Sequence, residues 1–147
     1  MRKIIKLILL IIWLIIIFYF SSQNGNTSQS LSDDLLGKSF FSFLNFNNLE
    51  YQEFIYKYGY YFRKAAHLME YLILGVLMYL NMIEYSNKNN VLISLLICII
   101  YAISDEIHQL FVINRSFMIK DIIIDSFGSL LGILICLFVY KKWKKDI

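Results

Sequence analysis

Residues 122–140 read IIIDSFGSLLGILICLFVY, an apolar run with a single charged residue, Asp125. A membrane-spanning helix needs about 20 such residues, so this run is long enough to cross a bilayer. Gly128 and Gly132 form a Gly-x-x-x-Gly pattern, which lets a second helix approach closely. We expect that second helix to come from the same chain rather than from a dimer. The run therefore predicts a membrane-spanning helix that packs tightly on a neighbour and carries one carboxyl group inside the membrane.

Three similar runs precede it along the chain. Of the 147 residues, 59% are hydrophobic and 17% are charged, and there is no proline. A soluble core of this size could not bury so much apolar surface, and long helices are not interrupted by proline. We therefore predict an all-α membrane protein with one domain over residues 1–147 and a bundle of four transmembrane helices, at about residues 4–20, 65–83, 91–110 and 122–140.

Basic residues flank the first and last runs, at residues 2–6 and 141–145. Lysine and arginine favour the cytoplasmic side, and an even number of spans puts both termini on one side. We expect both termini in the cytoplasm and residues 21–64 and 111–121 outside. The net charge of +3 sits in these flanking clusters, so it does not indicate a nucleic-acid partner.

The first run and the segment after it also have membrane features. The run could be a signal peptide, but residues 20–24 offer no small-x-small cleavage site, so an uncleaved anchor is expected. Apolar residues between Leu31 and Leu44 suit an interfacial helix in the first outer loop. Aromatic residues between Tyr51 and Phe62 suit a belt at the membrane surface. Cys98 and Cys136 lie in apolar runs without metal or disulfide spacing, and we interpret them as packing residues.

Histidines and carboxylic acids recur where the apolar runs reach the outer side. His67 and Glu70 share a helix face, and Asp105 and His108 have the same spacing on a helix that runs the opposite way. In each pair the carboxyl group lies about 4.5 Å deeper than the imidazole. The sequence therefore predicts two layers, with His67, His108 and Asp121 above Glu70, Asp105 and Asp125. Ionisable groups inside a membrane are costly and usually serve function or pairing.

Other polar residues are placed by the same helical spacing. Gln109 shares the face of Asp105, whereas Glu106 is two positions from His108 and should point away from the cluster. Just above His67 stand Arg63 and Lys64, and the short loop 111–121 supplies Arg115 and Lys120. These four cations predict a basic rim over an acidic floor.

The ordered motifs resemble the VanZ-like family. They are Lys64-x-x-His67-x-x-Glu70-Tyr71, Asp105-Glu106-x-x-Gln109-x-Phe111, Arg115, Asp121-x-x-x-Asp125, Gly128 and the earlier Phe20-Ser21-Ser22-Gln23. The resemblance covers nearly the whole chain and places Glu106 in the site, against the helical geometry. Ile113-Asn114 stands where Pro-Gly is expected, which leaves the turn before Arg115 open. The resemblance implies a small protein of the bacterial cytoplasmic membrane. Its name-giving member is associated with low-level teicoplanin resistance, so a role in glycopeptide resistance is expected, without a defined reaction.

These observations support two functional hypotheses. The first is an enzyme that acts on an envelope lipid or a lipid-linked cell-wall precursor, with an imidazole as general acid or base. The second is a non-catalytic protein that binds the same anionic head group, or whose polar cluster only holds the bundle together. The candidate catalytic residues are His67, Glu70, Asp105, Glu106, His108, Asp121 and Asp125. The candidate binding residues are Arg63, Lys64, Gln109, Arg115 and Lys120.

A metal centre is compatible with either hypothesis. His-x-x-Glu and Asp-x-x-His on adjacent helices resemble the spacing of metal sites in helical bundles. Two imidazoles with two or three carboxylates would suit zinc, manganese or iron. The sequence does not decide whether a metal or another cofactor binds. A transporter is the least favoured class, because no chain of polar residues continues toward the inner side.

Overall fold

The protein is a bundle of long helices, as seen in the computed structural model, which describes residues 2–25, 48–85 and 89–145. The helices are α1 (Arg2–Ser21), α3 (Asn48–Met82), α4 (Asn90–Gln109) and α5 (Ile119–Lys145), with a short 3-10 helix, η2 (Ile83–Tyr85), after α3. Each long helix holds one segment apolar enough to cross a membrane: Lys3–Ser21, Lys57–Tyr85, Asn90–Gln109 and Ile119–Lys142. The predicted all-α fold with four transmembrane helices is confirmed. The interfacial helix expected at residues 31–44 lies outside the described residues.

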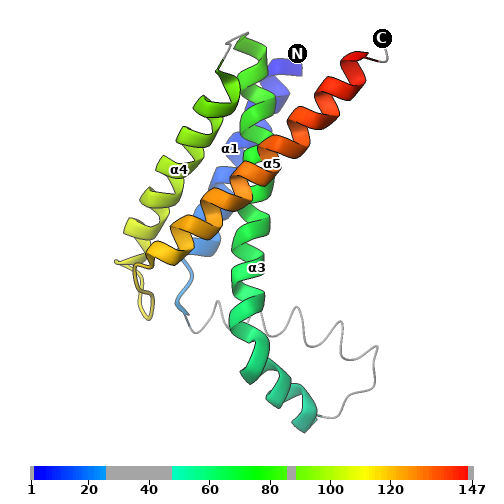
Figure 1. The fold of residues 1–147 in the computed structure, drawn as a ribbon. Helices are drawn as coiled ribbons and strands as arrows, with labels where there is room; N and C mark the ends of the chain where they lie inside the picture. The colour runs from blue at the N-terminus through cyan, green and yellow to red at the C-terminus, as the bar shows by residue number, and fades with distance from the viewer. Residues whose placement is uncertain (1, 26–47, 86–88, 146–147) are drawn as a thin grey trace.

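α3 is longer than the sequence suggested. It begins at Asn48, well before residue 65, and runs without a break through the aromatic segment into the membrane span. Its N-terminal part extends beyond the other helices (Figure 1). Hydropathy marked where the apolar span starts, but a helix continues as long as its backbone bonds are satisfied and no proline interrupts it. Tyr58, Tyr60 and Tyr61 are exposed along this part of α3.

α3 and α5 form the most extensive helix pair, and three glycines make their approach close. A Cβ atom at Gly128 would lie 2.5 Å from the carbonyl oxygen of Leu68, and one at Gly132 would lie 2.0 Å from that of Leu72. On the facing helix, a Cβ at Gly75 would lie 2.2 Å from the carbonyl oxygen of Ser129. The Gly-x-x-x-Gly pattern thus serves packing within the chain, as predicted.

α1 packs against α3 and, less extensively, against α4. The indole Nε1 of Trp13 donates to the carbonyl oxygen of Glu70 at 2.9 Å, and the hydroxyl of Tyr101 donates to that of Leu14 at 2.8 Å. Between these helices lie buried side chains that include Ile17, Tyr71 and Cys98. Many large apolar side chains on the outer faces are exposed, which suits a bundle surrounded by lipid.

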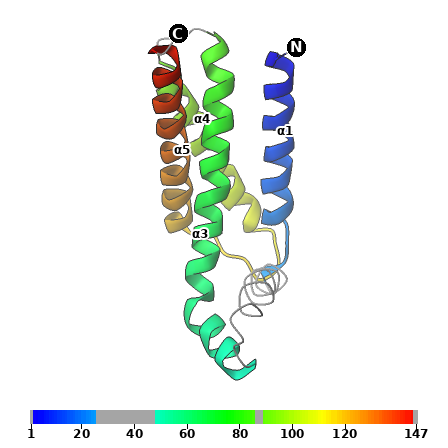
Figure 2. The same cartoon turned by 90° about the vertical axis from the view of Figure 1, so that its right-hand side faces the viewer.

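Both termini lie at one end of the bundle (Figures 1 and 2). The end of α1, the loop between α4 and α5, and the long N-terminal part of α3 lie at the other end. The polar motifs are thereby gathered at the end opposite the termini, as the alternating direction of the spans predicted.

Candidate functional site

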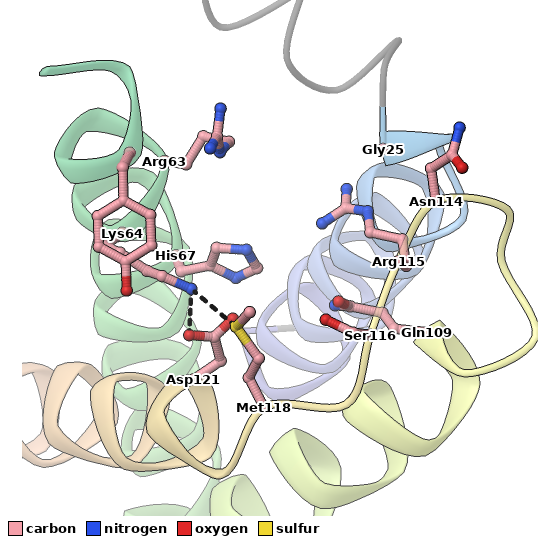
Figure 3. Close-up of a pocket in the computed structure, with 11 residues that line it drawn as sticks. Gly25, Arg63, Lys64, His67, Gln109, Asn114, Arg115, Ser116, Met118 and Asp121 are labelled. Carbon is pink, nitrogen blue, oxygen red and sulfur yellow. Dashed lines mark hydrogen bonds and ion pairs between the residues drawn. The ribbon is translucent and has the colours of Figure 1, made fainter. Parts of the chain in front are cut away.

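A pocket of about 230 Å³ lies at this second end of the bundle. Its walls come from the end of α1, from α3, from the end of α4 and from the loop that leads into α5 (Figure 3). The lining residues are Gly25, Tyr60, Arg63, Lys64, His67, Gln109, Asn114, Arg115, Ser116, Met118 and Asp121. We refer to this cavity as the polar pocket.

A buried Asp121 and a partly buried Lys64 form an ion pair on one wall of the polar pocket. Asp121 lies in the first turn of α5, where a carboxylate also interacts favourably with the helix dipole. The Lys64 ammonium stands 5.1 Å from the ring centroid of Tyr60 and 3.9 Å from the sulfur of Met118. Lys64 therefore already has a carboxylate partner and is not a free cation of the rim.

His67 lines the polar pocket and is backed by Asp125. Its Nδ1 lies 3.8 Å from Oδ1 of Asp125, whose side chain is fully buried. Neither Asp125 oxygen has a hydrogen-bond partner among the described residues. The sequence predicted Asp125 in the layer below His67. The close α3–α5 contact brings this carboxyl group next to the imidazole.

Two arginines face each other across the pocket (Figure 3). Arg115 uses its Nε and Nη2 to donate to backbone carbonyls of Gln23, at 3.3 Å, and Phe20, at 3.5 Å. Burial lowers the pKa of Arg115, but a guanidinium stays charged in proteins. Arg63 makes no ion pair or hydrogen bond with another residue that the structure describes. The hydrogen-bond partners of Arg115 among the described residues are thus carbonyl oxygens rather than carboxylates.

Asp105 and Glu106 are both buried below the polar pocket. Asp105 accepts a 3.1 Å hydrogen bond from Nε2 of Gln109, while Glu106 accepts one of 2.8 Å from the backbone N–H of Met118. The other oxygen of each carboxyl group has no partner among the described residues. The helical-wheel prediction that Glu106 points away from the cluster is therefore wrong, because its carboxyl group is buried and interacts with the charges of Asp121 and Asp105. Glu106 does not line the pocket, and the site role that the family motif implies stays a prediction.

Six of the candidate residues are not part of the pocket lining: Glu70, Asp105, Glu106, His108, Lys120 and Asp125. The ring of His108 stacks near Phe18 of α1, at 4.6 Å between centroids, and its Nε2 lies 3.0 Å from the hydroxyl of Ser22. Lys120 is exposed. Glu70 is half-buried beside α1, close enough to Asp105 for their charges to interact. His108 therefore packs against the end of α1 and does not line the pocket with His67.

The structure also adds residues that the sequence did not single out: Gly25, Tyr60, Asn114, Ser116 and Met118. Asn114 has φ 58°, a left-handed conformation that glycine and asparagine adopt more readily than other residues. Asparagine can thus take the place of the glycine that the family resemblance led us to expect. The signal for Gly25 was the Phe20–Gln23 motif just before it, which had no explanation in helical spacing.

The spacing that suggested a metal centre does not produce one in the described part of the chain. No group of three or more His, Cys, Asp or Glu side chains there is arranged to hold a metal ion. The physical reason is that His67 packs toward α5 and His108 toward α1, so the two imidazoles do not converge.

Comparison with known proteins agrees with the motifs. The model of the VanZ/LLP1 family matches residues 6–140, which is most of the chain. Neither the curated proteins nor the solved structures that were compared with the chain gave a match. With its four transmembrane helices and this match, the protein belongs to the VanZ/LLP1 family.

Proposed function

We propose that the polar pocket binds the anionic head group of an envelope lipid or of a lipid-linked cell-wall precursor. One observation carries this proposal: Arg63 and Arg115 face the same cavity, and neither has a carboxylate hydrogen-bonded or ion-paired to it among the described residues. Two such cations repel each other unless an anion lies between them. Guanidinium groups bind phosphate in a bidentate geometry, which makes a phosphate-bearing head group the best fit.

The position of the polar pocket supports a lipid rather than a soluble anion. The exposed Tyr58, Tyr60 and Tyr61 lie on α3 near the pocket, and tyrosine is enriched at the level of lipid head groups. The basic termini lie at the opposite end, and by the positive-inside rule this supports a pocket on the outer side of the membrane. A ligand bound there would connect the protein to the envelope and to the glycopeptide resistance that the family resemblance implies.

A catalytic role is the second candidate, and one specific observation favours it. A fully buried carboxyl group, Asp125, lies directly behind the pocket-lining imidazole of His67. A carboxylate in that position would orient the ring and stabilise its protonated form, as general acid–base catalysis requires. In the alternative in which the polar cluster only holds the bundle together, His67 and Asp125 would be a packing pair with no role for the pocket.

The binding proposal is tested on the purified full-length chain in detergent. It is titrated with short-chain phosphatidylglycerol, with a polyprenyl phosphate and with short-chain phosphatidylcholine. We expect the two ligands with net negative charge to bind more tightly, and Arg63→Ala and Arg115→Ala each to weaken that binding roughly tenfold or more. The matched control is Lys120→Ala, which removes an exposed cation outside the pocket. Equal affinities of the arginine variants and the parent protein would refute the proposal.

The orientation is tested separately in intact cells. Cys98 and Cys136 are replaced by Ala, and a single cysteine is placed at Ile113, which is 71% exposed in the loop beside the pocket. Labelling by a membrane-impermeant thiol reagent is expected without permeabilisation. Labelling only after permeabilisation would place the pocket in the cytoplasm and exclude an outward-facing site.

A further inference from the structure

We propose that the segment at the end of the first transmembrane helix helps to form the polar pocket by holding Arg115 in position. In this proposal Gly25 and Asn114 are positioning residues, which dock the end of α1 against the α4–α5 loop and thereby aim Arg115. The proposal rests on the proposed function, because it assigns Arg115 the anionic head group as its ligand.

Three hydrogen bonds join the end of α1 to the loop. The backbone N–H of Gly25 donates to the carbonyl oxygen of Ile113 at 3.1 Å, and the other two come from the Arg115 guanidinium to Gln23 and Phe20. Carbonyl groups at and just after the C-terminal end of a helix carry partial negative charge; that of Phe20 also accepts a 3.2 Å hydrogen bond from the backbone N–H of Gln23. The end of α1 therefore both holds the guanidinium and compensates part of its charge, without using a carboxylate.

The approach of the two segments requires a glycine at position 25. A Cβ atom there would lie 2.1 Å from the backbone oxygen of Asn114 and 2.9 Å from its carbonyl carbon. Both are backbone atoms, so no side-chain rotation relieves the contact. Any larger residue must push the loop away from α1, and the loop carries Arg115.

Asn114 supplies the matching turn in the loop. Its φ of 58° directs the chain so that Ile113 meets Gly25 and Arg115 meets Gln23. Asparagine and glycine tolerate this conformation, whereas a β-branched residue does not. The neighbouring contact between Ser22 and His108 holds the same end of α1 on α4.

This docking leaves the remaining donors of Arg115 free for a ligand. A guanidinium has five N–H donors, and the two carbonyl bonds use only part of them. Figure 3 shows the guanidinium directed toward the space near His67 and Arg63. The first helix is thus more than a membrane anchor, because without its end Arg115 has no fixed direction.

The test uses four variants of the full-length chain: Gly25→Ala, Asn114→Val, Asn114→Gly and Arg115→Ala. Amide hydrogen exchange of residues 111–118, measured without ligand, reports whether the loop is docked. Affinity for short-chain phosphatidylglycerol reports whether Arg115 is held in position to bind the head group. We expect Gly25→Ala and Asn114→Val to raise the exchange and to weaken binding roughly tenfold, as Arg115→Ala does. Asn114→Gly keeps the turn and should match the parent protein in both measurements.

Each result decides one part of the proposal. Unchanged exchange in Gly25→Ala would overturn the docking, and raised exchange with full affinity would overturn the aiming of Arg115. Full affinity in Arg115→Ala would instead refute the proposed function, while the exchange data would still decide the docking. Heating each variant, with Cys136 replaced by Ala, in the presence of a thiol-reactive dye tests folding, because the remaining Cys98 is fully buried and reacts only when the bundle opens.

Discussion

The two ends of the bundle both carry ion pairs, but they use them differently. At the end that holds the termini, Lys3 and Lys6 of α1 pair with Glu84, which follows α3. The side-chain amide of Asn81 adds a 3.1 Å hydrogen bond to the carbonyl oxygen of Lys6. Asn81 is buried, whereas Lys3, Lys6 and Glu84 are partly or largely exposed, and all four join segments that are distant in the sequence. At this end the ion pairs and the hydrogen bond therefore connect α1 to α3 and to the residues that follow α3.

At the pocket end, some ionisable side chains have no ion-pair or hydrogen-bond partner among the described residues. Arg63 has no ion pair there, and both oxygens of Asp125 lack a hydrogen-bond partner among the described residues. Burying such groups is costly, and apolar residues of similar size would stabilise the bundle better. The contrast teaches that the pocket end is not explained by stability. This is the physical reason to look for a ligand there.

The largest effect is expected from Lys64→Met, because it leaves Asp121 buried without its counterion. Removing one partner of a buried ion pair typically costs about 3–5 kcal/mol. The loss is measured as a lower temperature for dye reaction of the buried Cys98. Replacing both partners, in Lys64→Met with Asp121→Leu, should restore much of the stability. A double variant no more stable than the single one would show that the pair is not the source of the effect.

A smaller loss of stability is expected from Gly132→Ala, at a position between the two ends of the bundle. Its new Cβ would lie 2.0 Å from the backbone oxygen of Leu72, so α3 and α5 must separate. Overpacking of this kind costs about 1–3 kcal/mol, again measured through Cys98. The control is Leu134→Ala on the same helix, since Leu134 is 45% exposed on the lipid side. Equal stability of the two variants would contradict backbone contact between the helices.

Asp125→Asn should raise the stability of the bundle, whereas the two previous variants lower it. The amide keeps the shape of the side chain but replaces a buried carboxyl group that has no hydrogen-bond partner in the described structure. We expect a gain of about 1 kcal/mol in stability, together with unchanged affinity for phosphatidylglycerol. Any reaction found for the protein should be lost at the same time, because His67 would no longer face a carboxylate. A destabilised variant would show that the carboxyl group of Asp125 holds the bundle together.

The position of the helices could be predicted from the sequence, because apolar length alone decides what crosses a membrane. The gathering of the polar motifs at one end followed from the alternating direction of the spans. Residues within α4 were harder to place. Counting back from Glu106 in steps of four residues gives small, buried side chains. Counting back from His108 in the same steps gives Ser104 and Ile100, which are exposed. The small residues are Ser94, Cys98 and Ala102, and they mark the packed face better than the histidine did.

The partners of Arg115 could not have been predicted by residue type. They are backbone carbonyls of Phe20 and Gln23, and every residue has such a group. Only the folded chain shows that the end of α1 reaches the loop. The same holds for Gly25, whose role depends on a contact with Asn114 across the bundle. Helical spacing relates residues within one helix, and these contacts join a helix end to a loop.

The smallest effect is expected from Glu84→Gln at the end that holds the termini. This change removes the carboxylate that pairs with Lys3 and Lys6, but all three groups are partly exposed and screened by salt. The temperature of Cys98 reaction should fall only slightly, and about 1 M salt should bring the parent protein close to the variant. Neither phosphatidylglycerol affinity nor exchange of residues 111–118 should change, because the pocket lies at the other end. A loss of stability as large as that of Lys64→Met would contradict the contrast between the two ends. The exposed ion pairs of Glu84 would then stabilise the bundle as much as the pair of Lys64 and Asp121.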